Sequence, residues 1–144
     1  MEKAGRAIGR QIVVVNASSE RDFDTAFATL VQQQAGRLLV ATDPFLLSRR
    51  DQLVALADRY ALPAMYQFRE FATAGGLMSY GTNIAGAYHQ AGEYAGRILK
   101  GVKPADLPIF EQTNLELVIN LKTAKTLGLT IPPSLLVLAD ETIE

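Results

Sequence analysis

The sequence contains no cysteine, no tryptophan and a single histidine among its 144 residues. Without cysteine the chain has no disulfide, no iron–sulfur or thiolate zinc site and no thiol nucleophile. One histidine makes a His-rich metal centre or a Ser–His–Asp triad a poor interpretation. These absences exclude much of redox, metal and covalent catalysis.

An excess of charge of one sign is also missing, as are long apolar runs. Lys plus Arg number 14 and Asp plus Glu number 15, which gives a formal charge of −1. Binding to nucleic-acid phosphates needs a cationic surplus or stripe, so we expect no nucleic-acid partner. No apolar run is longer than Leu135–Ala139, which is far shorter than the ~18 residues that cross a bilayer. Residues 1–10 lack the apolar segment of a secretory signal, so the chain as written is expected to stay in the cytoplasm.

Sequence motifs for cofactors are absent as well. The chain has no G-x-G-x-x-G after a strand, no G-x-x-x-x-G-K-[ST], no G-x-S-x-G and no H-E-x-x-H. Gly96 and Gly101 have the spacing of a phosphate-binding loop, but Val102 stands where the lysine would be. We therefore expect neither a cofactor nor a metal.

What is present is the composition of a globular protein, with 49% hydrophobic and 20% charged residues. A chain of this length buries enough surface for one core, which predicts a single α/β domain over residues 1–144. Short β-branched or apolar runs alternate with amphipathic helical stripes, and this alternation is typical of βαβ units. The pattern predicts a three-layer α/β/α sandwich with a mainly parallel sheet, and strands at 11–15, 37–41, 64–67, 77–80 and 115–120.

Ligands of open α/β sheets bind beyond the carboxyl ends of the strands, and the segments there are polar and aromatic. Arginine binds a carboxylate, an acidic side chain binds an ammonium, and aromatic rings cover an apolar body. Such a set suits an amino acid or a similar small solute. The candidate residues are Asp43, Phe45, Tyr66, Phe68, Arg69, Glu70, Tyr80 and Asn83.

Structural interpretations of these residues remain open. Asp43 precedes Pro44 and is equally typical of a turn, and the adjacent charges of Arg69 and Glu70 also suit a solvated loop. Tyr66 and Tyr80 suit a core from which only the hydroxyls emerge. Two other functions therefore compete with solute binding. One is a small enzyme that uses Asp43, Arg69 or Glu70 as acid–base groups, and the other is an interaction domain without a ligand.

Four segments resemble a known family. They are DPFLLSRR (43–50), FREFATAGGLMSYG (68–81), ILKGVKPADLPI (98–109) and LELVINLKTAKTLGLTIPPSLL (115–136). Together they resemble the C-terminal part of the substrate-binding proteins of ABC transporters, in the subgroup that binds tryptophan and other amino acids. The resemblance covers nearly the whole chain.

The resemblance implies a non-enzymatic, periplasmic binding protein that serves an ABC permease. Family members have two lobes of the type I periplasmic-binding-protein kind, which clamp a ligand between them. This chain resembles the second lobe only, and thus half of a clamp for an amino acid or small carboxylate. From side-chain chemistry we expect Arg69 to bind the ligand's carboxylate, Asp43 or Glu70 its ammonium, and the aromatic side chains to stack on it.

Residues 83–100 form a predicted helix that, by the same resemblance, packs on the absent first lobe. Its apolar stripe comprises Ile84, Tyr88, Ala91, Ala95, Ile98 and Leu99. Either the helix folds back on its own sheet, or two chains exchange it around Gly81 and Gly101. Because exchange gives a closed two-fold assembly that covers the stripe, we expect a homodimer.

Overall fold

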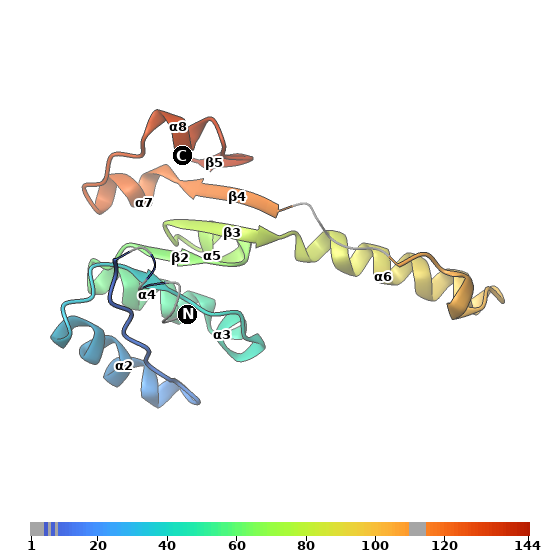
Figure 1. Cartoon of the computed structure of the whole chain (residues 1–144), viewed down its shortest axis with the longest axis horizontal. Coiled ribbons are helices and arrows are strands. Elements are labelled where there is room, and N and C mark those ends of the chain that lie inside the picture. The colour runs from blue at the N-terminus through green and yellow to red at the C-terminus, as the bar shows by residue number, and fades with distance from the viewer. Residues whose placement is uncertain (1–4, 6, 8, 110–114) are drawn as a thin grey trace.

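A computed structural model describes residues 5, 7, 9–109 and 115–144, and its centre is a five-stranded sheet (Figure 1). The strands lie side by side in chain order, with β1, β2 and β3 parallel to one another. β4 runs antiparallel to β3, and β5 is parallel to β4. The predicted α/β fold with a mainly parallel sheet is therefore confirmed. The strands are β1 (Leu38–Leu39), β2 (Ala64–Tyr66), β3 (Met78–Thr82), β4 (Leu115–Asn120) and β5 (Glu141–Ile143).

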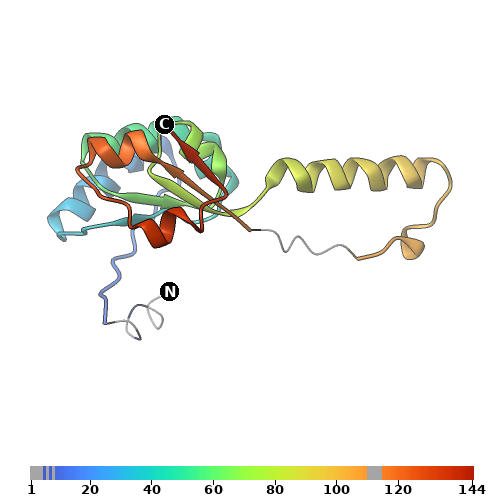
Figure 2. The same ribbon diagram turned by 90° about the horizontal axis from the view of Figure 1, so that it is seen from above.

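Helices lie on both faces of this sheet. α4, α5 and α7 cover one face, α8 lies on the other, and α2 packs against α4 (Figure 2). No helix in the described parts of the chain is long and apolar enough to span a membrane. The helices are α2 (Glu20–Gln32), α3 (Pro44–Ser48), α4 (Arg50–Arg59), α5 (Arg69–Thr73), α6 (Ile84–Leu99), α7 (Leu121–Thr126) and α8 (Pro133–Leu136).

Helix α2 begins where the local sequence predicts it. One carboxylate oxygen of Asp22 accepts hydrogen bonds from the backbone N–H groups of Ser18, at 2.9 Å, and Ser19, at 2.8 Å. These bonds, the one from Ser18 first, lower the pKa of Asp22 because they stabilise its charged form. The apolar stripe of the helix then buries Phe23, Phe27 and Leu30.

Residues 11–15 were expected to form a strand, and this prediction is wrong. The segment is assigned to no strand, although Val13 and Val15 pack against the core. Ile12 and Val14 are 38% and 58% exposed, so burial alternates as it does along a strand. A β-branched run favours extended backbone, but a strand also needs a hydrogen-bonded neighbour, and in the described parts of the chain β1 pairs with β2 alone.

The other predicted strands exist with shifted ends. β1 and β2 are shorter than the predicted 37–41 and 64–67, β3 continues past residue 80, and β4 has the predicted bounds. Sequence patterns did not predict β5. Its three residues are too few to show a periodic pattern, and the strand forms because it pairs with β4.

Helix α6 projects from the lobe together with the segment that follows it, and we call residues 84–109 the α6 arm (Figures 1 and 2). None of the α6 residues is buried; Tyr88 is 76% exposed and Leu99 is 87% exposed. The Tyr94 hydroxyl donates a hydrogen bond of 2.7 Å to the carbonyl of Pro108, which joins the helix to the returning segment. The chain thus presents the predicted helix without folding it back on its own sheet.

Candidate functional site

The candidate site lies at the edge where β1, β2 and β3 end. Asp43 caps α3 beyond β1, Phe68 precedes α5 beyond β2, and Asn83 caps α6 beyond β3. Because β4 is antiparallel, its beginning lies at the same edge, with Glu116 opposite Gly81. The topology therefore gathers side chains from four segments at one edge.

A glycine keeps two of these segments close. A Cβ added to Gly81 would lie 2.2 Å from the carbonyl oxygen of Gln67 and 2.6 Å from its Cγ. No real Cβ tolerates such a contact, so the end of β3 can pass the end of β2 only where a side chain is missing. This close approach places the start of α5 beside the end of β3.

Asp43 has the structural role that its position before Pro44 also suggested. Its Oδ1 accepts hydrogen bonds from the N–H groups of Phe45, at 2.7 Å, and Leu46, at 3.3 Å. The carboxylate is exposed, and it fixes the N-terminus of α3. One of its oxygens is therefore already bound by the protein.

The four aromatic candidates lie at different depths. Phe45 is half-buried and stacks on Phe23, with ring centroids 5.6 Å apart, and Phe68 is half-buried as well. Tyr80 is 47% exposed on β3, whereas Tyr66 is 1% exposed and stacks on Phe71 with ring centroids 4.5 Å apart. Burial raises the pKa of the Tyr66 phenol. The Tyr66 side chain thus belongs to the core beneath α5, while Tyr80 faces solvent.

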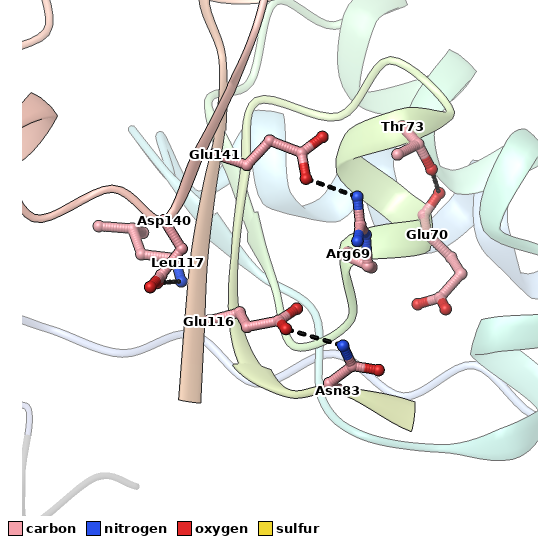
Figure 3. Close-up of polar contacts among 8 residues, drawn as sticks. All are labelled: Arg69, Glu70, Thr73, Asn83, Glu116, Leu117, Asp140 and Glu141. Atoms are coloured by element: carbon pink, nitrogen blue, oxygen red, sulfur yellow. Dashed lines mark hydrogen bonds and ion pairs between the residues drawn. The ribbon is translucent and has the colours of Figure 1, made fainter. Parts of the chain in front are cut away.

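Arg69 is paired with a residue far along the chain. Its Nη2 lies 2.6 Å from Oε2 of Glu141 on β5, and the two side chains are 37% and 43% exposed (Figure 3). This is a short, charge-assisted hydrogen bond. The guanidinium predicted to bind a ligand's carboxylate therefore binds a carboxylate of its own chain.

Asn83 connects α6 to β4. Its Oδ1 accepts from the N–H of Gly86 at 2.9 Å and caps the helix, and its Nδ2 donates to Oε1 of Glu116 at 2.7 Å (Figure 3). Next to it, Oδ2 of Asp140 accepts from the N–H of Leu117 at 2.7 Å. These bonds hold the start of β4 in place.

Glu70 differs from the other acidic residues of this edge. Its Oε2 is buried and has no hydrogen-bond partner, although buried carboxylate oxygens are normally satisfied. In Figure 3 its side chain points away from the pair formed by Arg69 and Glu141. Within the described parts of the chain, the buried Oε2 of Glu70 therefore has no donor.

Sequence reasoning missed three residues of this network, which are Glu116, Asp140 and Glu141. A polar residue inside the apolar run of β4 is a signal for Glu116. Glu141 has no such signal, because its contact joins residues 72 positions apart. Among the described residues no group of His, Cys, Asp and Glu is arranged to hold a metal ion.

Three solved structures share the fold. A conserved domain protein of Vibrio cholerae superposes with a TM-score of 0.84 at 23% identity, covering 97% of this chain and 47% of that protein. An ABC domain of Streptococcus pneumoniae in complex with L-Trp gives 0.84 at 25% identity, with 99% and 48% covered. A substrate-binding protein of Clostridium difficile with adhesive properties, in its ligand-free, open form, gives 0.66 at 20% identity, also with 99% and 48% covered.

The chain thus spans about half the length of each of these structures. No curated protein matches it. A family model described as ABC transporter substrate binding protein matches residues 3–143. This chain therefore belongs to the ABC transporter substrate-binding protein family, whose members bind solutes and are not enzymes.

Proposed function

We propose that the chain is a solute-binding module of an ABC importer and that its ligand is an amino acid or a small carboxylate. The observation that carries this proposal is the placement of Arg69, Glu70 and Asn83 where β2 and β3 end. The structure in complex with L-Trp, of which this chain covers 48%, supports an amino acid as the ligand.

The module contributes one wall of the binding site in this proposal. Asp43, Phe45 and Phe68 border the edge beside the polar groups, and Tyr66 supports them from below. Family members typically act outside the cytoplasm and deliver their solutes to ABC transporters. We extend both properties to this chain, with an ABC permease as its partner.

Isothermal titration calorimetry tests the proposal with the 20 standard L-amino acids and a set of short carboxylates. We expect saturable heat for at least one solute, no product, and loss of binding in Arg69→Ala, which removes the ion pair that joins α5 to β5. Arg37→Ala is the matched control, because Arg37 is exposed and lies before β1, at the opposite end of the strands. Formation of a product would support an enzyme, and complete silence would support an interaction domain.

We also propose that the chain forms a homodimer by exchanging the α6 arm. The stripe of α6 recurs in alternating steps of four and three residues, from Ile84 to Ile98, which is the spacing of a helix that packs on a partner. One sheet face also carries exposed apolar side chains, with Leu39 61% and Tyr80 47% exposed. In this proposal, exchange of the α6 arm between two chains covers both the stripe of α6 and this face of the sheet.

Light scattering at micromolar concentration tests the dimer. Twice the chain mass is expected for the wild type and for Lys103→Glu, since Lys103 is exposed. Ile98→Asp places a charge in the stripe and is expected to dissociate or unfold the dimer. A monomeric mass for the wild type contradicts the proposal.

A further inference from the structure

The charged groups at the candidate site differ in whether the protein already uses them. Asp43 caps α3, Glu116 accepts from Asn83, and Arg69 is paired with Glu141. Glu70 alone among these acidic groups keeps a buried carboxylate oxygen without a donor. Among the described residues of the site, Glu70 therefore offers a buried carboxylate oxygen that has no donor.

A buried carboxylate oxygen without a partner destabilises the folded protein, because it has lost water and gained no donor. A donor from outside the chain removes this cost. An ammonium group has three N–H donors and no acceptor, so it suits an unpaired carboxylate. A ligand's carboxylate has only acceptors at neutral pH and would be repelled.

The remaining charges favour the same kind of ligand. Five described carboxylates lie in this network, those of Asp43, Glu70, Glu116, Asp140 and Glu141, together with the guanidinium of Arg69. Since Glu141 already occupies the Arg69 guanidinium at 2.6 Å, an anionic ligand has to displace it. A cationic group meets no such competitor.

We propose that this chain recognises the ammonium group of its solute through Glu70, and that Glu141 excludes free carboxylates by holding Arg69. The proposal rests on the solute-binding function proposed above and makes it more specific. The ligand class is then a primary amine, including an amino acid bound by its amino end. Glu70 and Glu141 become the residues that determine specificity.

Two sets of probes separate the two ends of the ligand. The first is L-tryptophan, tryptamine and indole-3-propionate, and the second is L-leucine, isoamylamine and 4-methylpentanoate. In calorimetry with the full chain, we expect the amino acid and the amine of at least one set to bind and the corresponding acid not to bind. Glu70→Gln is expected to weaken the amine at least tenfold, which is about 1.4 kcal/mol.

Glu141→Gln provides the opposite test. It frees the Arg69 guanidinium, so indole-3-propionate or 4-methylpentanoate is expected to gain measurable binding while the amine is retained. Asp51→Asn is the control for both variants, since its side chain is 79% exposed and forms an ion pair with neighbouring Arg50. Glu70→Gln removes an unpaired charge, so its thermal midpoint is expected to equal or exceed that of the wild type.

Other results overturn the assignment. Unchanged amine affinity in Glu70→Gln, or wild-type binding of an acid without its amine, assigns recognition to another group. If some amino acids of the full panel bind but all six probes are silent, the ammonium assignment fails and the solute-binding function stands. If no solute of the whole panel binds, both the ammonium assignment and the solute-binding function are contradicted.

Discussion

Replacing Gly81 by alanine is expected to damage both the fold and the candidate site. The new Cβ would lie 2.2 Å from the carbonyl oxygen of Gln67, 2.6 Å from its Cγ and 3.1 Å from its carbonyl carbon. The side-chain atom can rotate away, but the carbonyl belongs to the backbone that links β2 to α5. The two strands must therefore separate by about 1 Å at this end, because a carbon and an oxygen atom ordinarily stay more than ~3 Å apart.

Overpacking that requires a backbone shift costs about 1–3 kcal/mol, and the backbone clash places Gly81→Ala near the upper value. In a domain of this size about 3 kcal/mol lowers the thermal midpoint by about 10 °C. The assay is urea and thermal unfolding followed by circular dichroism, with solute binding measured on the fraction that stays folded. Because α5 moves with Gln67, binding through Glu70 is expected to weaken as well.

Gly92→Ala is the matched control. Gly92 lies inside α6, where an added Cβ meets nothing within 4 Å, and alanine favours a helix interior by about 0.5–1 kcal/mol over glycine. Its unfolding midpoint is expected to stay at or slightly above that of the wild type. A midpoint for Gly81→Ala within about 2 °C of the wild-type value would refute the close approach of β2 and β3.

Three further changes test single contacts. Tyr66→Phe removes a buried hydroxyl that has no partner among the residues the structure describes, so unfolding in urea is expected to show a gain of up to about 1 kcal/mol; a loss would reveal an acceptor for this hydroxyl. Asn120→Ala removes the 3.1 Å bond from Nδ2 to the carbonyl of Ala72 and the acceptor for the N–H of Thr123, and we expect a loss of about 2–3 kcal/mol, with Asn120→Asp intermediate because it keeps the cap. Asp22→Asn removes a carboxylate whose folded pKa lies below its ordinary value; its stabilising effect is present above the unfolded pKa and lost as pH falls through the folded pKa. The variant is therefore expected to be less stable than the wild type at pH 7 and equally stable at pH 2, and a difference that persists at pH 2 would assign the effect to packing.

Features that depend on neighbouring residues could be predicted from the sequence. The contact of Asp22 with Ser19 and the caps formed by Asn83 and Asn120 depend on spacings of three residues or fewer, so the local pattern is sufficient. The run 117–119 of β4 also shows in the sequence, because consecutive residues are apolar where both faces of a strand are covered.

Features that depend on distant partners could not be predicted in this way. The segment 11–15 has the pattern of a strand but no neighbour, and β5 has a neighbour but no pattern. For the candidate site, the residue types at the strand ends were visible in the sequence. The pairing of Arg69 with Glu141, which changes what Arg69 can bind, follows only from the tertiary fold.

The α6 arm has a consequence for the connectivity of the chain. It leaves the sheet after Thr82 and returns before Leu115, and these two residues are partners in the antiparallel pairing of β3 and β4. Topologically the arm is thus a long loop in a β-hairpin, and none of the buried core residues comes from residues 84–109. A short turn in place of residues 83–114 would close the same hairpin with a smaller loss of chain entropy. The lobe should then fold without the α6 arm, as a minimal domain in which β3 and β4 are directly connected.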